Sequence, residues 1–149
     1  MLLKEAVCTA FNEQLKSKIA IAESALASAK ASRDNETKSS AGDKYETGRE
    51  LMQFEMDKQS GQLNQLKLLQ GELAKINRQQ PLQQAGFGSL IGTNQGNYLL
   101  SVSLGKVKVG TTSCYALSLM SPLGKVLLGK SVDDSFTFQG KELTIQSLC

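Results

Sequence analysis

Apolar residues in the first half of the chain recur at alternating steps of four and three positions. The first series is Leu15, Ile19, Ala22, Leu26 and Ala29. The second series, which includes two glutamines, is Met52, Met56, Gln59, Leu63, Leu66, Gln70 and Leu73. Because this spacing is typical of coiled-coil seams, it predicts two long helices that pack against each other.

The two series can be aligned as an antiparallel hairpin over residues 1–80. The spacing sets Leu15 opposite Leu63, Ile19 opposite Gln59, Ala22 opposite Met56 and Leu26 opposite Met52. This register places the turn near residue 39, within a tip at residues 38–43 where helix propensity is weakest. Arms of about 35 residues would each extend roughly 50 Å. An arm of that shape buries little surface per residue, so we expect it to reach a partner rather than to house an active site.

Glycines interrupt the second arm at Gly48, Gly61 and Gly71. Each should cost on the order of 1 kcal/mol relative to alanine within a helix. Close approach of the two arms is one explanation for them.

The composition changes at Pro81, the first proline of the chain. Residues 81–86 are predicted to be a linker, and residues 87–149 alternate apolar and polar positions in the manner of strands. Ser121 followed by Pro122 is typical of a helix start, and Gly129 is placed to end that short helix. The sequence therefore predicts an α+β protein, in which a helical hairpin precedes a small antiparallel sheet with one short helix.

Composition removes several classes of chemistry. The chain contains no histidine, which excludes Ser-His and Cys-His catalysis and histidine-ligated metals. Cys8, Cys114 and Cys149 form no CxxC pair, so we expect reduced thiols without a zinc site or a disulfide. No apolar run approaches the roughly 18 residues of a membrane span, and no signal-peptide core appears. We expect a cytoplasmic protein without a membrane partner, and its net charge of +3 is too small to indicate nucleic-acid binding.

Residues 124–131 match the phosphate-loop pattern GxxxxGK[ST]. A true phosphate loop exposes its backbone amides and opens a helix. Here three of the four middle residues are apolar, and the predicted helix precedes Gly129 instead of following it. We therefore reject nucleotide binding by this segment.

The predicted tip carries two carboxylates, Asp43 and Glu46, directly after Gly42. Their spacing is that of a capping box at the start of the second helix. Carboxylate oxygens also suit Mg²⁺, which often takes only one or two protein ligands. A basic collar surrounds the pair, and its members are Arg33, Lys38, Lys44 and Arg49. Such a collar is most often a solvated surface, although it also suits contact with RNA or an acidic channel wall.

Several motifs together resemble the bacterial Gre-type transcript cleavage and transcription elongation factors. The resemblance covers most of the chain and rests on Phe87-Gly88-Ser89, on Ser121-Pro122-Leu123 with Gly129-Lys130, on Val132-Asp133-Asp134, and on Gly42-Asp43 with Glu46. It implies an FKBP-like C-terminal domain that docks on RNA polymerase through Ser121, Pro122, Leu123, Gly129 and Lys130. It also implies that the hairpin enters the secondary channel of the polymerase.

In this family the tip carboxylates help to position the catalytic Mg²⁺ and a water molecule, so that the polymerase itself cleaves backtracked RNA. The resemblance thus assigns Asp43 and Glu46 an accessory catalytic role and a shared metal. It implies indirect contact with nascent RNA and no cofactor of the chain's own. Another alignment anchors Tyr45 and Arg49 on the family pattern. That alignment puts Lys38 and Ala41 at the acidic positions and predicts a regulator that occupies the channel without cleavage.

Two other classes of function are open at this stage. An FKBP-like prolyl isomerase would need an aromatic pocket, for which the C-terminal half has few candidates. A scaffold protein would dimerise through its helices, whereas the intramolecular hairpin predicts a monomer.

Overall fold

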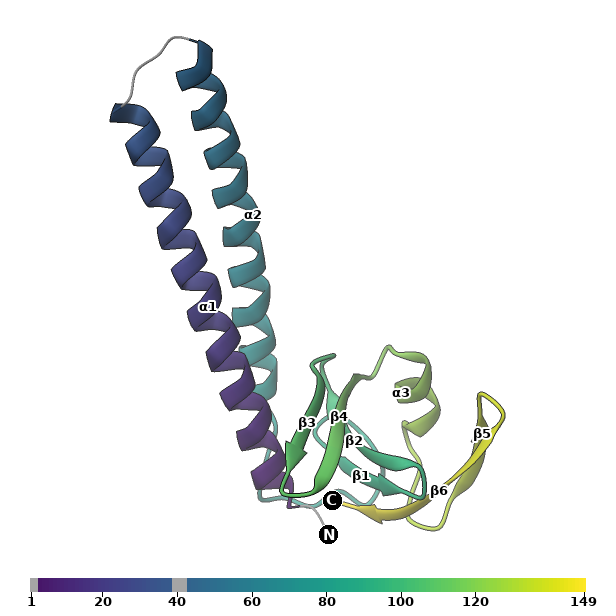
Figure 1. Ribbon diagram of the computed structural model, residues 1–149. Coiled ribbons are helices and arrows are strands. Elements are labelled where there is room, and N and C mark those ends of the chain that lie inside the picture. The colour runs from purple at the N-terminus through teal and green to yellow at the C-terminus, as the bar shows by residue number, and fades with distance from the viewer. Residues whose placement is uncertain (1–2, 39–42) are drawn as a thin grey trace. The chain divides into compact units, whose positions relative to one another are not determined.

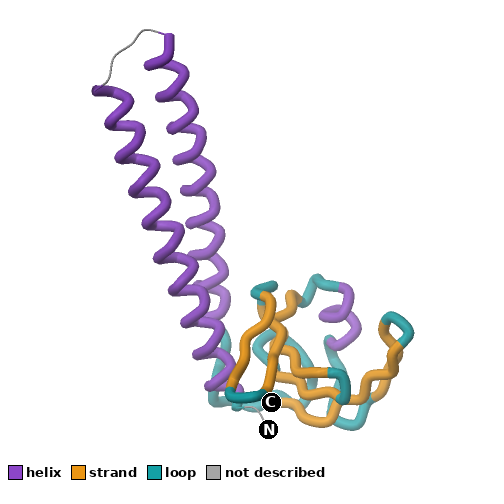
Figure 2. Tube along the Cα trace, viewed as in Figure 1, coloured by secondary structure: helices purple, strands orange, loops and turns teal. Residues whose placement is uncertain are grey.

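The computed structural model describes residues 3–38 and 43–149, with the side chains of residues 35–47 outside the described part. Two long helices come first, α1 (Lys4–Lys38) and α2 (Asp43–Ala74). The second half is formed by β1 (Leu90–Thr93), β2 (Gly96–Ser101), β3 (Gly105–Val109), β4 (Thr112–Ser118), α3 (Pro122–Leu127), β5 (Ser135–Phe138) and β6 (Lys141–Leu148). This is the predicted α+β architecture of a helical hairpin followed by a sheet with one short helix (Figures 1 and 2).

Internal contacts divide the chain into two compact units. One unit is Gln14–Gln70, and the other joins Met1–Glu13 to Gly71–Cys149. The predicted division at residues 81–86 followed the change in composition. The contacts instead group the first three turns of α1 and the end of α2 with the sheet.

In the helical unit α1 and α2 run side by side (Figure 1), and a narrow apolar cluster lies between them. Its buried residues are Ile19, Ala22 and Leu63, with Leu26 and Leu66 packed against them. Further along, Arg33 Nη1 donates a hydrogen bond of 3.0 Å to Gln53 Oε1. The seam positions are therefore those predicted, but their pairing is not.

The predicted register set Ile19 and Ala22 opposite Gln59 and Met56, whereas both share a cluster with Leu63. The register is thus shifted by about one heptad. A seam repeats every seven residues, so sliding one helix by seven positions again faces apolar residues with apolar residues. α1 ends at Lys38 and α2 begins at Asp43, and the predicted turn near residue 39 lies outside the described residues.

The structure offers no packing reason for two of the α2 glycines. A Cβ atom built on Gly61 or on Gly71 would meet no other atom within 4 Å. Close approach of the arms is therefore the wrong explanation for both. Each glycine lowers helix stability without a compensating contact among the described residues.

Gly61→Ala and Gly71→Ala are each expected to raise the free energy of unfolding by about 0.5–1 kcal/mol. Urea denaturation followed by circular dichroism measures the change. The matched control is Gly88→Ala, which should destabilise, because φ is +89° and a Cβ would lie 3.3 Å from Ile76 Cγ2. Destabilisation by the Gly61 or Gly71 substitution would show that these positions need glycine for folding.

The six strands form one sheet in the order β3-β4-β2-β1-β6-β5. Neighbouring strands are antiparallel except for β2 and β4, which run parallel with Tyr98 opposite Tyr115. The prediction of an antiparallel sheet is wrong for this pair. The chain leaves β2, forms the edge strand β3 and returns through a tight antiparallel hairpin, which gives β4 the direction of β2.

Each face of the sheet is covered by apolar residues. On one face, Leu127 of α3 joins a core with Ala85, Ile91, Leu100 and Ile145. On the other face lie Leu90, Leu99, Cys114 and Ala116, all buried. The buried residues Val7, Cys8 and Phe11 of α1 and Leu73 of α2 belong to the same unit.

The start of α1 is tied to the segment after α2 by a buried lysine. Lys4, only 6% exposed, donates through Nζ to the carbonyl oxygens of Gln80 (3.1 Å) and Asn77 (3.4 Å). Arg78 Nη1 donates to Thr9 Oγ1 at 3.2 Å. A buried ammonium group is tolerated when polar partners replace its water, so these bonds fix the connection between α2 and the sheet.

Candidate functional site

The best-defined local structure in the sheet unit is the start of α3. Ser121 is the N-cap, with φ −68° and ψ 156°, and its Oγ accepts a bond of 3.0 Å from Gly124 N. The same hydroxyl donates to Ser118 O at 2.6 Å. Gly124 is required here, because a Cβ would collide with the carbonyl oxygen of Ser118. The segment Ser121 to Gly124 is therefore held rigidly against the end of β4.

The end of α3 is fixed by the linker and by β6. Gly129, at φ +83°, donates to Ala85 O at 2.7 Å, and Ala85 N donates to Lys130 O at 2.8 Å. The turn that follows is closed by Asp134, whose Oδ2 accepts from Ser131 N at 2.8 Å. Asp133, at φ 74°, donates its N–H to Ile145 O at 2.8 Å.

The structure agrees with the rejection of a phosphate loop at residues 124–131. The residues between Gly124 and Gly129 lie in or next to α3, and Leu127 is fully buried. The helix precedes Gly129, as predicted. Backbone amides that already bond within a helix are not available to cradle a phosphate.

The predicted docking residues lie in α3 or directly before and after it. Pro122 and Gly129 are exposed, Ser121 and Lys130 are half-buried, and Leu123 lines a pocket. Three apolar side chains of the same segment are also exposed: Met120 (75%), Leu128 (53%) and Val132 (44%). Exposed apolar groups on a rigid segment suit a protein-binding surface.

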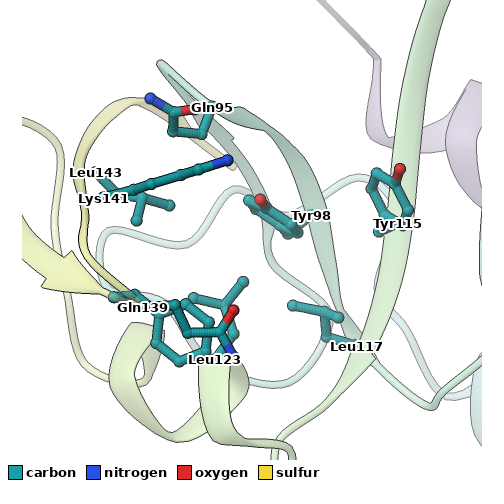
Figure 3. A pocket seen from close by; sticks show the side chains of 9 residues that line it. Gln95, Tyr98, Tyr115, Leu117, Leu123, Gln139, Lys141 and Leu143 are labelled. Carbon is teal, nitrogen blue, oxygen red and sulfur yellow. The ribbon is translucent and has the colours of Figure 1, made fainter.

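A pocket of about 370 Å³ opens beside α3 (Figure 3). Its apolar walls are Tyr98, Tyr115, Leu117, Leu123, Phe138 and Leu143. Its polar groups are Gln95, Gln139 and Lys141, from the β1–β2 turn, the β5–β6 turn and β6. Figure 3 shows the Lys141 side chain extending across the pocket toward Tyr98.

The two tyrosines of the pocket lie on neighbouring parallel strands. Their ring centroids are 6.2 Å apart with a tilt of 32°, and Lys106 Nζ lies 5.9 Å from the Tyr115 ring centroid. Burial, with a smaller contribution from Tyr115, raises the pKa of Tyr98. The Tyr98 hydroxyl is thus a neutral hydrogen-bond donor throughout the physiological range.

The residues predicted for the hairpin tip fall largely outside the described side chains. This holds for Asp43, Glu46, Lys38 and Lys44, so the accessory catalytic role and the shared Mg²⁺ stay predictions. Arg33 is described, and its Nη2 lies 3.4 Å from Asp34 Oδ1. Arg49 is exposed on α2.

No group of three His, Cys, Asp or Glu residues able to hold a metal occurs among the described residues. Within the same part of the chain, no helix is both long and apolar enough to cross a bilayer. The cysteines are free thiols, with Cys8 and Cys114 buried. Burial raises the pKa of Cys8, and it raises that of Cys114 to about 12.

The pocket was not predicted as a site from the sequence. From the sequence, Tyr98 and Tyr115 were predicted strand residues and two of the few aromatic candidates for an isomerase pocket. Gln95 and Gln139 were predicted turn residues, and Lys141 gave no signal. One sign was present, because both tyrosines begin alternating apolar runs. Only the parallel pairing of β2 with β4 brings those runs side by side.

Known proteins were compared with the chain by sequence and by structure. No protein-family model matches the chain, and no curated protein matches it. Among solved structures, the chain is similar to one described as the structure of the transcription factor Gfh1. The match has 19% sequence identity and a TM-score of 0.38, and it covers 93% of this chain and 93% of that chain.

Proposed function

We propose that this chain is an accessory factor of RNA polymerase, in which the α3 segment docks on the polymerase and the hairpin enters its secondary channel. One observation carries the proposal: within the motif from Ser121 to Lys130, residues Pro122–Leu127 form a short helix capped by Ser121, with exposed apolar residues beside it. These are the residues through which the chain resembles the Gre-type factors. The chain acts as a cytoplasmic monomer and performs no catalysis of its own.

The helical hairpin supports this proposal by its dimensions. Helices of 35 and 32 residues each extend roughly 50 Å. The buried seam between them is narrow, as expected of an arm that presents its end to a partner. Helices of this length suit a narrow, deep channel in a large enzyme.

At the tip, Asp43 and Glu46 would meet the active centre of the polymerase. Two carboxylates there would help to hold Mg²⁺ and to orient a water molecule toward the backtracked RNA. Bond cleavage would then be performed by the polymerase. The second form of the proposal is a factor that occupies the channel without stimulating cleavage.

Docking is tested by binding to purified core RNA polymerase. Leu128→Glu is expected to weaken binding at least about tenfold, because it places a charge in an apolar contact. Leu3→Glu is the matched control, since Leu3 is 71% exposed and lies at the other end of the sheet unit's sequence. Absence of wild-type binding, or equal loss in both variants, would contradict docking through α3.

Cleavage is tested on stalled, backtracked elongation complexes. The double variant Asp43→Asn/Glu46→Gln should release the 3′ RNA fragment at least about tenfold more slowly than wild type, with unchanged polymerase affinity. Glu50→Gln is the control for removal of a nearby charge. If wild type binds the polymerase but never accelerates release, the channel occupant is the correct form.

A further inference from the structure

The pocket beside α3 combines three features that a single class of ligand would satisfy. It has an aromatic wall at Tyr98 and Tyr115, two amide side chains, and one cation, Lys141. We propose that this pocket binds a purine nucleotide, with the base stacked on Tyr98, the amides hydrogen-bonded to the base edge, and Lys141 on the phosphate. The inference does not depend on the function proposed above.

The size and the wall of the pocket fit a base with its sugar. A volume of about 370 Å³ falls within the range of about 300–1,000 Å³ typical of small-molecule sites. Tyr98 is half-buried and its ring faces the pocket (Figure 3). Flat rings stack on tyrosine in an offset arrangement, and a purine offers a larger face for this than a pyrimidine does.

The charge of the pocket selects an anion. Lys141 is the only charged residue of the lining, and it forms no ion pair with any described residue. A second cation, Lys106, lies over the Tyr115 ring with its Nζ 5.9 Å from the ring centroid. Lys141 is exposed, so a phosphate held by its ammonium group would keep part of its hydration.

The side-chain amides of Gln95 and Gln139 favour a base over an apolar ligand that forms no hydrogen bonds. The side chains of Gln95 and Gln139 form no hydrogen bonds with the described residues, and Gln139 is held at φ 52° in the β5–β6 turn. An apolar ligand would remove water from both amides without replacing their hydrogen bonds, which is unfavourable. A purine carries hydrogen-bond donors and acceptors in the plane of its ring, so it can stack on an aromatic side chain and form hydrogen bonds at the same time.

The experiment is a titration of the full chain with AMP and GMP, followed by calorimetry and by tyrosine fluorescence. The chain has no Trp and only three Tyr, two of which line the pocket. Stacking of a ligand on these rings should therefore change the tyrosine fluorescence. At least one of the two nucleotides is expected to bind with a dissociation constant below about 1 mM. Adenosine or guanosine should bind at least about fivefold more weakly, and ribose 5-phosphate should not bind detectably.

Tyr98→Leu and Lys141→Gln should each weaken nucleotide binding at least about tenfold. Lys125→Gln is the matched control, because Lys125 is exposed on α3 and lies outside the pocket lining. Lys141 is also exposed, so its variant tests the site even if Tyr98→Leu fails to fold. Two results would overturn the proposal: no binding of either nucleotide, or binding of a proline-containing peptide that displaces the nucleotide and is indifferent to Lys141→Gln.

Discussion

Replacing Phe11 with alanine is expected to lower the free energy of unfolding by about 3–5 kcal/mol. Phe11 is fully buried, and it belongs to the unit that contains the sheet, not to the hairpin unit. Its neighbours in sequence, Val7 and Cys8, are also fully buried. Loss of the ring removes its apolar transfer energy and leaves a cavity that rigid helix and strand backbones cannot fill.

Phe54→Ala supplies the matched control, since Phe54 is 70% exposed on α2. Its change in stability should stay within about 0.5 kcal/mol, as is usual for surface positions. Both variants are measured by urea denaturation at neutral pH. Equal effects of the two substitutions would contradict the burial of Phe11, and a small effect of both would mean that the start of α1 is dispensable for folding.

A large effect at Phe11 would place the first turns of α1 within the folding unit of the sheet. The hydrogen bonds from Lys4 to Asn77 and Gln80 support this grouping, because they hold the start of α1 to the segment after α2. The start of α1 and the end of α2 therefore belong to the same unit as the sheet. A change of composition in the sequence, such as that at Pro81, marks where strands replace helices rather than where packing ends.

The helices of the hairpin were predictable because a seam is a local, repeated signal. Leu15, Ile19 and Ala22 face inward whatever their partners are, and all three are buried. The partners were not predictable, since a shift of one heptad preserves the match between the seams. Longer side chains off the seam, such as Arg33 on Gln53, give no periodic signal that would identify the register.

The same distinction between local and distant contacts applies to the sheet unit. The cap at Ser121, the proline after it and the left-handed Gly129 are local chemistry, and the short helix was predicted from them. The parallel pair of β2 and β4 depends on how the chain crosses between strands, which alternation does not encode. The pocket was missed for this reason, because its lining comes from residues spread between Gln95 and Leu143.

The free energy of unfolding is expected to fall steeply between pH 9 and pH 12. Burial, followed by the nearby Cys8, raises the pKa of the Cys114 thiol from 9.0 to about 12. In this window the unfolded chain releases the thiol proton while the folded chain retains it, so the folded state binds more protons. Stability from Cys114 is then complete below pH 9 and is lost as the pH rises toward 12, by up to about 1.4 kcal/mol per pH unit.

The full contribution of Cys114 amounts to about 4 kcal/mol, an upper limit that follows from a shift of about three units. Burial raises the pKa values of Cys8 and Tyr98 in the same direction. For the wild-type protein, the slope of the free energy of unfolding against pH should therefore exceed the slope that one proton alone would give. Protein in excess reductant is unfolded with urea at several pH values between 8 and 11.5, and the slopes are compared.

Cys114→Ala isolates the contribution of this thiol. The variant starts at a different stability, because a buried side chain has been shortened, but its slope above pH 9 should be shallower by up to one proton. Cys8→Ala should reduce the slope as well, since burial also raises the pKa of that thiol. Parallel curves for wild type and Cys114→Ala would mean that the thiol reaches water without unfolding. The tight packing of Cys114 in the structure, where its side chain is fully buried, predicts that it does not.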